Sequence, residues 1–261
     1  MKSDSFRGMR FCFPLLLLLA GGLVLRAADE AEPVKTPPRQ MRLLTVGEDP
    51  PFRQEIRDGV RYQLPAPPGS LPPVELEVMV AAGDDREKAS GSLRLRMGSM
   101  SAPVTVPGGV RPLIFRVPKA GMESEPWHRI QPPENGDFIV VMWRGQKDNT
   151  WDKPSSFVIP ANLPPGKASL VNVAPGTVAV VYDSEKIALP PKRPVMRTLN
   201  PGKPIGFQVG LSRGNGFKRL VSRSLEQGPG QHSIVVFYRA DGEKPRSPLG
   251  IEVIRLNAGK E

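Results

Sequence analysis

Cysteine is nearly absent from this chain. Its 261 residues include only Cys12, which lies in an apolar N-terminal segment. If that segment is cleaved, the remaining protein has no thiol, which excludes disulfides, a cysteine nucleophile and thiolate-bound metals. Histidine is also scarce, with only His128 and His232 in the chain. A zinc site with two histidine ligands would therefore need both of them together with carboxylates. We therefore predict no metal and no cofactor.

Long apolar runs are missing too. The longest, Phe11 to Leu25, has 15 residues, fewer than the roughly 20 that a transmembrane helix needs. It follows basic residues and precedes Ala27 and Ala28, which is the order of a secretory signal peptide. We predict that residues 1–27 are removed and that the protein is periplasmic or secreted. Because large residues stand just before the cut, a retained membrane anchor is the open alternative.

The composition disfavours long helices. With 31 prolines and 26 glycines, the chain suits short strands joined by turns. Val74 to Val80 and Ser92 to Met97 alternate apolar with charged residues, which is typical of strands with one face in water. Phe138 to Trp143 and Ile234 to Tyr238 are apolar almost throughout, as expected of central strands. The fold class that follows is all-β.

The second half repeats the first in outline. Ile139-Val-Val-Met-Trp-Arg144 matches Ile234-Val-Val-Phe-Tyr-Arg239 at an offset of 95 residues. Two further matches have an offset of 92: Pro112 to Val117 with Pro204 to Val209, and Leu71-Pro-Pro73 with Leu163-Pro-Pro165. Ordered matches at nearly one spacing favour duplication of a unit of about 90 to 100 residues, the size of an immunoglobulin-like sandwich.

The domain organisation follows from these patterns. We predict a signal peptide at 1–27, a proline-rich extended lead-in at 28–71 and tandem antiparallel β-sandwiches at 72–160 and 161–261. Within the lead-in, Met41 to Val46 and Val60 to Leu64 are expected to form short strands. Residues 217–225 fit a helix, whereas residues 218–226 fit the first strand of a hairpin with 231–239. We favour the hairpin, because Gln227-Gly-Pro-Gly230 supplies a turn between them.

The second half also resembles small exported β-sandwich domains of unknown function from Gram-negative bacteria. The resemblance runs from Ala168-Ser-Leu-Val-Asn-Val-Ala-Pro175 to Leu256 and rests on the pattern of strands with Asn172 and Pro175. It implies a sandwich fold and a location in the cell envelope. It implies no activity.

One motif points to hydrolase chemistry. Gly210-Leu-Ser-Arg-Gly214 has the spacing of a hydrolase nucleophile elbow, with Glu226 and His232 downstream. In that interpretation Ser212 would attack, His232 would act as base and Glu226 would orient the imidazole. The elbow requires a parallel strand followed by a helix, which this chain does not provide. We expect a glycine-rich loop between antiparallel strands and no catalytic residue, with a serine hydrolase as an alternative.

A predicted turn in the Ile139 to Ile159 hairpin carries two other candidates. Asp148, Asn149 and Asp152 could bind calcium through oxygen atoms, although turns favour these residues without any ligand. Trp151 has only polar neighbours, so an exposed indole could stack on a sugar ring or anchor a partner. The competing interpretation is that this indole folds back onto the core. Trp151 is thus a candidate binding residue, and a carbohydrate-binding module is a second alternative.

Positive charge is concentrated in the second half. Without residues 1–27 the chain has 32 basic and 25 acidic residues, and residues 161–261 alone have 15 basic and 7 acidic. Basic residues on adjoining predicted strands could form one patch: Arg213, Lys218, Arg219, Arg223 and Arg239. Such a patch would attract anionic lipid, lipopolysaccharide phosphates, acidic glycans or another envelope protein, more weakly as salt rises. Export argues against nucleic acid as a partner.

The function that fits these observations is an exported envelope protein of binding or scaffolding type, without enzymatic activity. The basic segment 161–261 is its expected contact surface. A basic surface with no dedicated partner is the competing interpretation. The chain would span a membrane only if the signal segment were retained.

Overall fold

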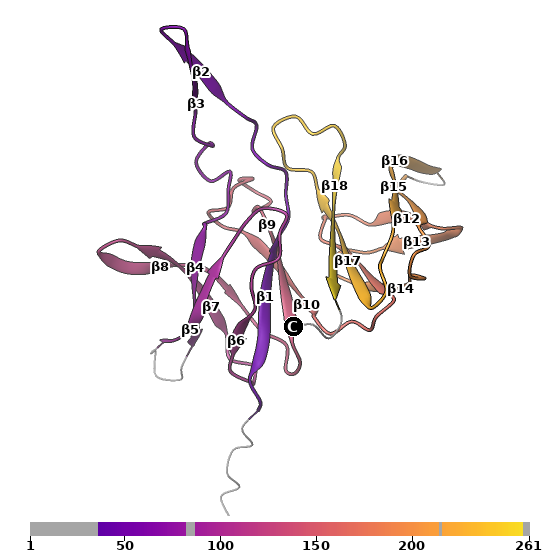
Figure 1. Ribbon diagram of the computed structural model, residues 1–261, viewed down its shortest axis with the longest axis horizontal. Helices are drawn as coiled ribbons and strands as arrows, with labels where there is room; N and C mark the ends of the chain where they lie inside the picture. The colour runs from indigo at the N-terminus through magenta and orange to yellow at the C-terminus, as the bar shows by residue number, and fades with distance from the viewer. Residues whose placement is uncertain (1–35, 82–86, 214–215, 258–261) are drawn as a thin grey trace, which may run out of the picture. The chain divides into compact units, whose positions relative to one another are not determined.

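The computed structural model describes residues 36–81, 87–213 and 216–257, which form 18 strands and no helix (Figure 1). The all-β prediction is confirmed. The expected signal peptide lies outside the described residues. Within the part of the chain that is described, no helical segment is long and apolar enough to span a membrane.

The first sandwich consists of two four-stranded sheets. One has the order β10-β9-β1-β6, in which β1 and β9 pair in parallel. The other has the order β5-β4-β7-β8 and is antiparallel throughout. The strands are β1 (Arg39–Thr45), β4 (Glu75–Ala81), β5 (Glu87–Arg94), β6 (Val104–Val106), β7 (Leu113–Lys119), β8 (Met122–Ile130), β9 (Phe138–Trp143) and β10 (Ser155–Pro160).

The second sandwich is built in the same way. Its sheets have the orders β14-β11-β17-β18, with β11 and β17 parallel, and β13-β12-β15-β16. The strands are β11 (Lys167–Asn172), β12 (Val178–Tyr182), β13 (Glu185–Leu189), β14 (Val195–Thr198), β15 (Ile205–Arg213), β16 (Gly216–Leu225), β17 (Gln231–Arg239) and β18 (Leu249–Asn257). The prediction of tandem sandwiches is confirmed.

The two sandwiches share one strand order, as duplication requires. The strands of each sandwich are counted here in chain order, with β2 and β3 left out. In both sandwiches the first strand pairs with the fourth and the seventh, and the second strand pairs with the third and the fifth. The register also agrees: Leu44 pairs with Val141, and Val171 with Val236, 95 residues after Val141. One proposed match is wrong. Leu71 precedes the second strand of its sandwich, whereas Leu163 precedes the first strand of the other.

The burial of each strand explains its sequence pattern. In β4, Leu76, Val78 and Val80 are buried and the residues between them are more exposed, as alternation predicts for a sheet with one wet face. All six residues of β9 are buried, because both faces of its sheet are covered. Inside each sandwich the two sheets enclose a separate apolar core.

A third apolar core joins the two sandwiches. It brings the sheet that contains β9 against the sheet that contains β17. Its members come in pairs from equivalent positions of the two repeats, such as Ile139 with Ile234 and Val141 with Val236. Trp143 and Tyr238 are another such pair. The two sandwiches therefore pack through the same face, which was not predicted.

Two predictions about the chain need correction. The segment expected as an extended lead-in contains β1, a central strand of the first sandwich, so this sandwich begins before residue 72. Residues 216–225 form a strand, as favoured over a helix, but β16 pairs with β15 and not with β17. The segment Gln227 to Gly230 crosses from one sheet to the other, which a turn-forming sequence does not distinguish from a hairpin.

A two-stranded hairpin interrupts the first repeat. It consists of β2 (Gln54–Arg57) and β3 (Val60–Gln63), and it projects from the first sandwich (Figure 1). Its turn has Asp58 and Gly59 at positive φ values of 50° and 75°, the conformation of a type I′ turn. The described part of the second sandwich has no corresponding hairpin between β11 and β12.

Candidate functional site

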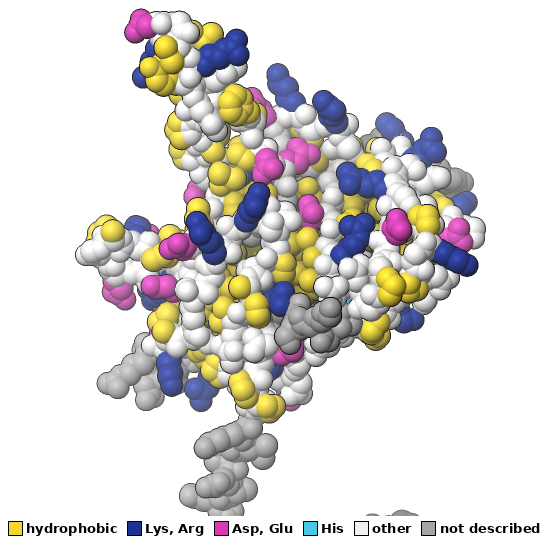
Figure 2. Space-filling view, viewed as in Figure 1, with side chains coloured by type: hydrophobic (Ala, Val, Ile, Leu, Met, Phe, Trp, Pro, Cys, Tyr) yellow, Lys and Arg dark blue, Asp and Glu magenta, His cyan; other side chains and the backbone are white. Residues whose placement is uncertain are grey.

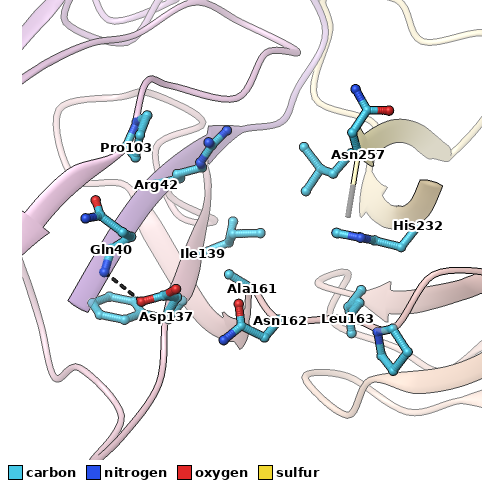
Figure 3. Close-up of a pocket in the computed structure, with 13 residues that line it drawn as sticks. Gln40, Arg42, Pro103, Asp137, Ile139, Ala161, Asn162, Leu163, His232 and Asn257 are labelled. Carbon is cyan, nitrogen blue, oxygen red and sulfur yellow. Dashed lines mark hydrogen bonds between the residues drawn. The ribbon is translucent and has the colours of Figure 1, made fainter. Parts of the chain in front are cut away.

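A cleft of about 640 Å³ lies where the two sandwiches meet (Figure 3). Its polar side chains are Gln40, Arg42, Asp137, Asn162, His232 and Asn257. Figure 3 shows Gln40, Arg42 and Asp137 on the side of the first sandwich and His232 and Asn257 on the side of the second. Apolar residues, among them Ile139 and Leu163, line the rest of the cleft.

The cleft reflects the internal duplication. Asp137 and His232 occupy equivalent positions at the offset of 95 residues, as do Asn162 and Asn257. A carboxylate oxygen of Asp137 accepts a hydrogen bond of 2.8 Å from the backbone N–H of Gln40. Among the described residues that line it there is no serine, threonine, cysteine or lysine that could act as a nucleophile.

The hydrolase motif is not arranged as a catalytic site. Gly210 to Arg213 lie in β15, which pairs with β16 in antiparallel fashion, and Gly214 lies outside the described residues. The antiparallel pair was predicted, but the described part of the motif is strand and not loop. The side chain of Ser212 lies outside the described residues. His232 is on β17 and lines the cleft toward the first sandwich, whereas β15 belongs to the sheet on the opposite side of β17. Glu226 uses its carbonyl oxygen to accept a bond from Arg255.

Metal ligands do not gather in the described part of the chain. No group of three or more His, Asp or Glu side chains there could hold an ion. His128 lies on β8, where its Nε2 is 2.8 Å from the hydroxyl of Ser156, and burial lowers its pKa. In the turn proposed for calcium, Asn149 donates its side-chain amide to the carbonyl of Asp241, 2.9 Å away. That amide therefore links the two sandwiches.

Trp151 is not exposed, so its proposed role as a surface binding residue is wrong. Its side chain is 1 % exposed and belongs to the core of the first sandwich. The N–H of Trp151 donates to the carbonyl of Gly69, and its own carbonyl accepts a bond from the indole of Trp127. The two indoles stack with centroids 6.5 Å apart. The competing interpretation, an indole folded back onto the core, describes what is observed.

A basic groove of about 450 Å³ opens on the second sandwich. We call it the basic groove, and it is formed by β16, the segment between β17 and β18, and the chain after β1. The cations of the groove are Arg223, Lys244 and Arg246. Tyr238 and Glu48 also line it. Figure 2 shows Lys and Arg side chains at the end of the second sandwich where this segment lies. All three cations are exposed.

Burial shifts the pKa of one group in the groove and of one group beside it. Burial raises the pKa of the Tyr238 hydroxyl, which donates a hydrogen bond of 3.3 Å to the carbonyl of Gly47. Burial also raises the pKa of Glu252 on the adjacent β18, and the positive charge of Arg223 opposes that rise. Arg223, Lys244 and Arg246 form no ion pair with another described residue, although Glu48 lines the same groove.

The predicted basic residues are only partly brought together. Arg223 lines the groove, and Lys218 and Arg219 are exposed farther along the same strand. The side chain of Arg213 is not among those described. Arg239 is exposed on β17, in the other sheet, so the five residues do not lie on adjoining strands.

Sequence reasoning missed two of the groove cations. Lys244 and Arg246 lie in the segment Glu243-Lys-Pro-Arg-Ser247, between two apolar strands. The sequence did contain a signal for these cations, because a basic segment follows the central strand β17. Its closeness to Arg223 depends on how the two sheets stack.

Comparisons with known proteins give distant structural neighbours. No protein-family model and no curated protein matches the chain. A candidate cell adhesion protein from Bacteroides ovatus is similar at 12 % identity and a TM-score of 0.22, over 85 % of this chain and 99 % of that one. The TIE protein of Bacillus anthracis is similar at 10 % identity and a TM-score of 0.22, over 79 % of this chain and 34 % of that one. A streptococcal ancillary pilin is similar at 13 % identity and a TM-score of 0.18, over 80 % of this chain and 63 % of that one.

Proposed function

We propose that this protein is an exported binding protein without enzymatic activity, and that its basic groove holds a phosphate-bearing component of the cell envelope. The observation that supports this function is the cluster of Arg223, Lys244 and Arg246 around one groove, with no ion-pair partner among the described residues. Like charges gathered at one site repel one another, and an anion relieves that repulsion.

Other cations of the protein behave differently. Arg116 binds Glu87 at 2.6 Å, and Arg197 binds Glu185 at 2.5 Å. The groove cations contrast with these arginines because no ion pair is found for them among the described residues, even though Glu48 also lines the groove. Arginine and lysine side chains donate hydrogen bonds that suit phosphate oxygens, and arginine can bind them in a bidentate way.

Export is part of the proposal and is supported by the sequence of the first 28 residues. A chain without cysteine after that segment suits an oxidising compartment without risk of unwanted disulfides. The absence of a catalytic role is testable with a fluorophosphonate probe. We expect no labelling of Ser212, and labelling would contradict the proposal.

The binding experiment uses residues 28–261, which contain every described strand and all three cores. Inorganic tripolyphosphate is titrated by calorimetry at low and high salt. We expect R223Q/K244Q/R246Q to weaken binding by about tenfold or more, and salt to weaken it in the unmodified protein.

The matched control is K186Q/R193Q/K203Q, which removes three exposed charges of the same sandwich away from the groove. It should bind tripolyphosphate nearly as well as the unmodified protein. Equal loss in both variants would show that net charge, and not the groove, attracts the anion. No binding by the unmodified protein would also contradict the proposal.

A further inference from the structure

The β2–β3 hairpin and the residues just before it expose several large apolar side chains to solvent. Phe52 is 68 % exposed, Ile56 64 %, Val60 53 % and Tyr62 49 %. Every residue of both strands is exposed, so neither face of the hairpin packs on the sandwich. A hairpin of two strands is at best marginally stable in water, and clustered exposed apolar groups mark an interaction surface.

The apolar side chains lie on both faces of the hairpin. In the antiparallel register Ile56 is opposite Arg61, whereas Val60 is opposite Arg57 and Tyr62 opposite Glu55. Side chains alternate along a strand, so Ile56 points to one face and Val60 and Tyr62 point to the other. A protein partner docked on one face would leave the other in water. A lipid bilayer surrounds an inserted tip on all sides.

The charges of the hairpin also suit a bilayer surface. Arg53, Arg57 and Arg61 lie four residues apart among its apolar residues, and the acidic residues Glu55 and Asp58 lie between them. The guanidinium of Arg57 lies 6.0 Å from the centre of the Tyr62 ring and 2.8 Å from a carboxylate oxygen of Glu55. Long arginine side chains can keep their charge at the level of lipid phosphates while their stems lie among apolar groups.

The hairpin lies beside the basic groove. Glu48, in the chain that leads to the hairpin, lines the groove itself. Asp49 and Pro51 share a smaller hollow with Gly242 and Lys244. Figures 1 and 2 show the hairpin and the β17–β18 segment at the same end of the described part of the protein, with apolar, basic and acidic side chains on the hairpin. One surface can therefore meet the apolar tip and the groove together.

We propose that this end of the protein docks on a bilayer of anionic phospholipids. The tip of the hairpin enters the boundary between head groups and acyl chains, and Arg223, Lys244 and Arg246 meet lipid phosphates. This inference rests on the proposed function of the groove. Unpaired backbone groups along both edges of the hairpin limit it to the interfacial depth, because they need water or head groups as partners.

The first experiment measures co-sedimentation of residues 28–261 with vesicles of phosphatidylglycerol and phosphatidylcholine, and with vesicles of phosphatidylcholine alone. We expect binding to the anionic vesicles only. I56S/V60S should weaken it by about 100-fold and leave the affinity for tripolyphosphate unchanged, because only apolar area is lost. V110S/M196S removes two other exposed apolar side chains and is the matched control, expected to bind normally.

The outcomes separate the two proposals. If I56S/V60S binds vesicles as well as the unmodified protein does, bilayer docking by the hairpin is overturned. If the groove variant also loses tripolyphosphate binding, the proposed function of the groove still stands. Binding to neither tripolyphosphate nor vesicles would contradict both. Tripolyphosphate binding without vesicle binding would also overturn the bilayer and favour a protein or glycan partner.

A second measurement reports insertion directly. Residues 28–261 contain no cysteine, so I56C and M196C each supply one site for an environment-sensitive NBD label. We expect the label at position 56 to shift to the blue with anionic vesicles and to be quenched by nitroxide-labelled lipid. The label at position 196 should not respond. An unchanged spectrum at position 56 would overturn insertion even if the vesicles sediment the protein.

Discussion

Arg144 and Asp241 join the two sandwiches through an ion pair of 3.0 Å whose side chains are 4 % and 9 % exposed. The guanidinium of Arg144 also donates to the backbone carbonyls of Glu48 and Ser70, each 2.7 Å away, and to that of Asp241. The second carboxylate oxygen of Asp241 accepts the N–H of Glu48 at 2.8 Å. Burial raises the pKa of Asp241, against the opposing effect of Arg144.

Removing Arg144 should destabilise the protein strongly. R144A leaves Asp241 buried without its counter-charge, which costs about 3 to 5 kcal/mol for a well-buried pair. Arg239 occupies the equivalent position of the second repeat but is exposed, so R239A should change stability by no more than about 0.5 kcal/mol. Urea unfolding of the two variants tests this difference, and equal effects would contradict it.

The second sandwich alone should form a symmetric dimer. Excision of residues 161–261 uncovers the apolar face that contains Val171, Ile234 and Val236. In the intact chain this face packs on the equivalent face of the first repeat, and a second copy can take that place. We expect sedimentation to show a dimer and V236E to abolish it. A stable, folded monomer of the unmodified fragment would contradict the prediction.

Alkaline pH should destabilise the fold through its buried tyrosines. Burial raises the pKa of Tyr182 from 10.0 to about 12, and its hydroxyl donates to the carbonyl of Thr198. Because the folded phenol holds its proton more tightly than the unfolded one, this contribution is intact below pH 10 and is lost as pH rises toward 12. The loss approaches about 2 to 3 kcal/mol. The free energy of unfolding, measured with urea, should fall less in Y182F than in the unmodified protein between about pH 9 and 11, a range that brackets the ordinary tyrosine pKa of about 10. An equal fall in both proteins would contradict the prediction.

Gly210 of the hydrolase-like motif should be hard to replace, for a structural reason. A Cβ at this position would clash with the carbonyl oxygen of Lys218, where the register between β15 and β16 shifts. G210A should therefore cost about 1 to 3 kcal/mol. Gly206, on the same strand, has nothing within 4 Å of such a Cβ, so G206A is the control and should be tolerated. Thermal unfolding of both variants distinguishes the two positions.

The fold could be predicted as far as its strands. Alternation in Val74 to Val80 and continuous apolar character in Phe138 to Trp143 indicate how many faces of a strand are covered. They do not say what covers the second face. The core between the sandwiches was missed for that reason, although its members lie in the strands whose apolar character identified the duplication.

The candidate site was harder to predict. Charge counting led to the second sandwich and to Arg223, but Lys244, Arg246 and the hairpin reach the same end through tertiary packing. Trp151 was misleading because its polar neighbours predict a turn, while the indole itself folds beneath that turn onto Trp127. Local sequence reports the backbone of a turn better than the direction of one large side chain.

The parallel pairing inside each sandwich also determines when it can fold. Met41 on the first strand pairs with Phe138 on the seventh, and Ala168 pairs with Ser233 in the other repeat. Neither sheet can close until nearly all of its sequence has emerged, and contacts so distant along the chain form slowly. Such late closure leaves most of the chain unfolded until its synthesis is nearly complete, which is compatible with the proposed export.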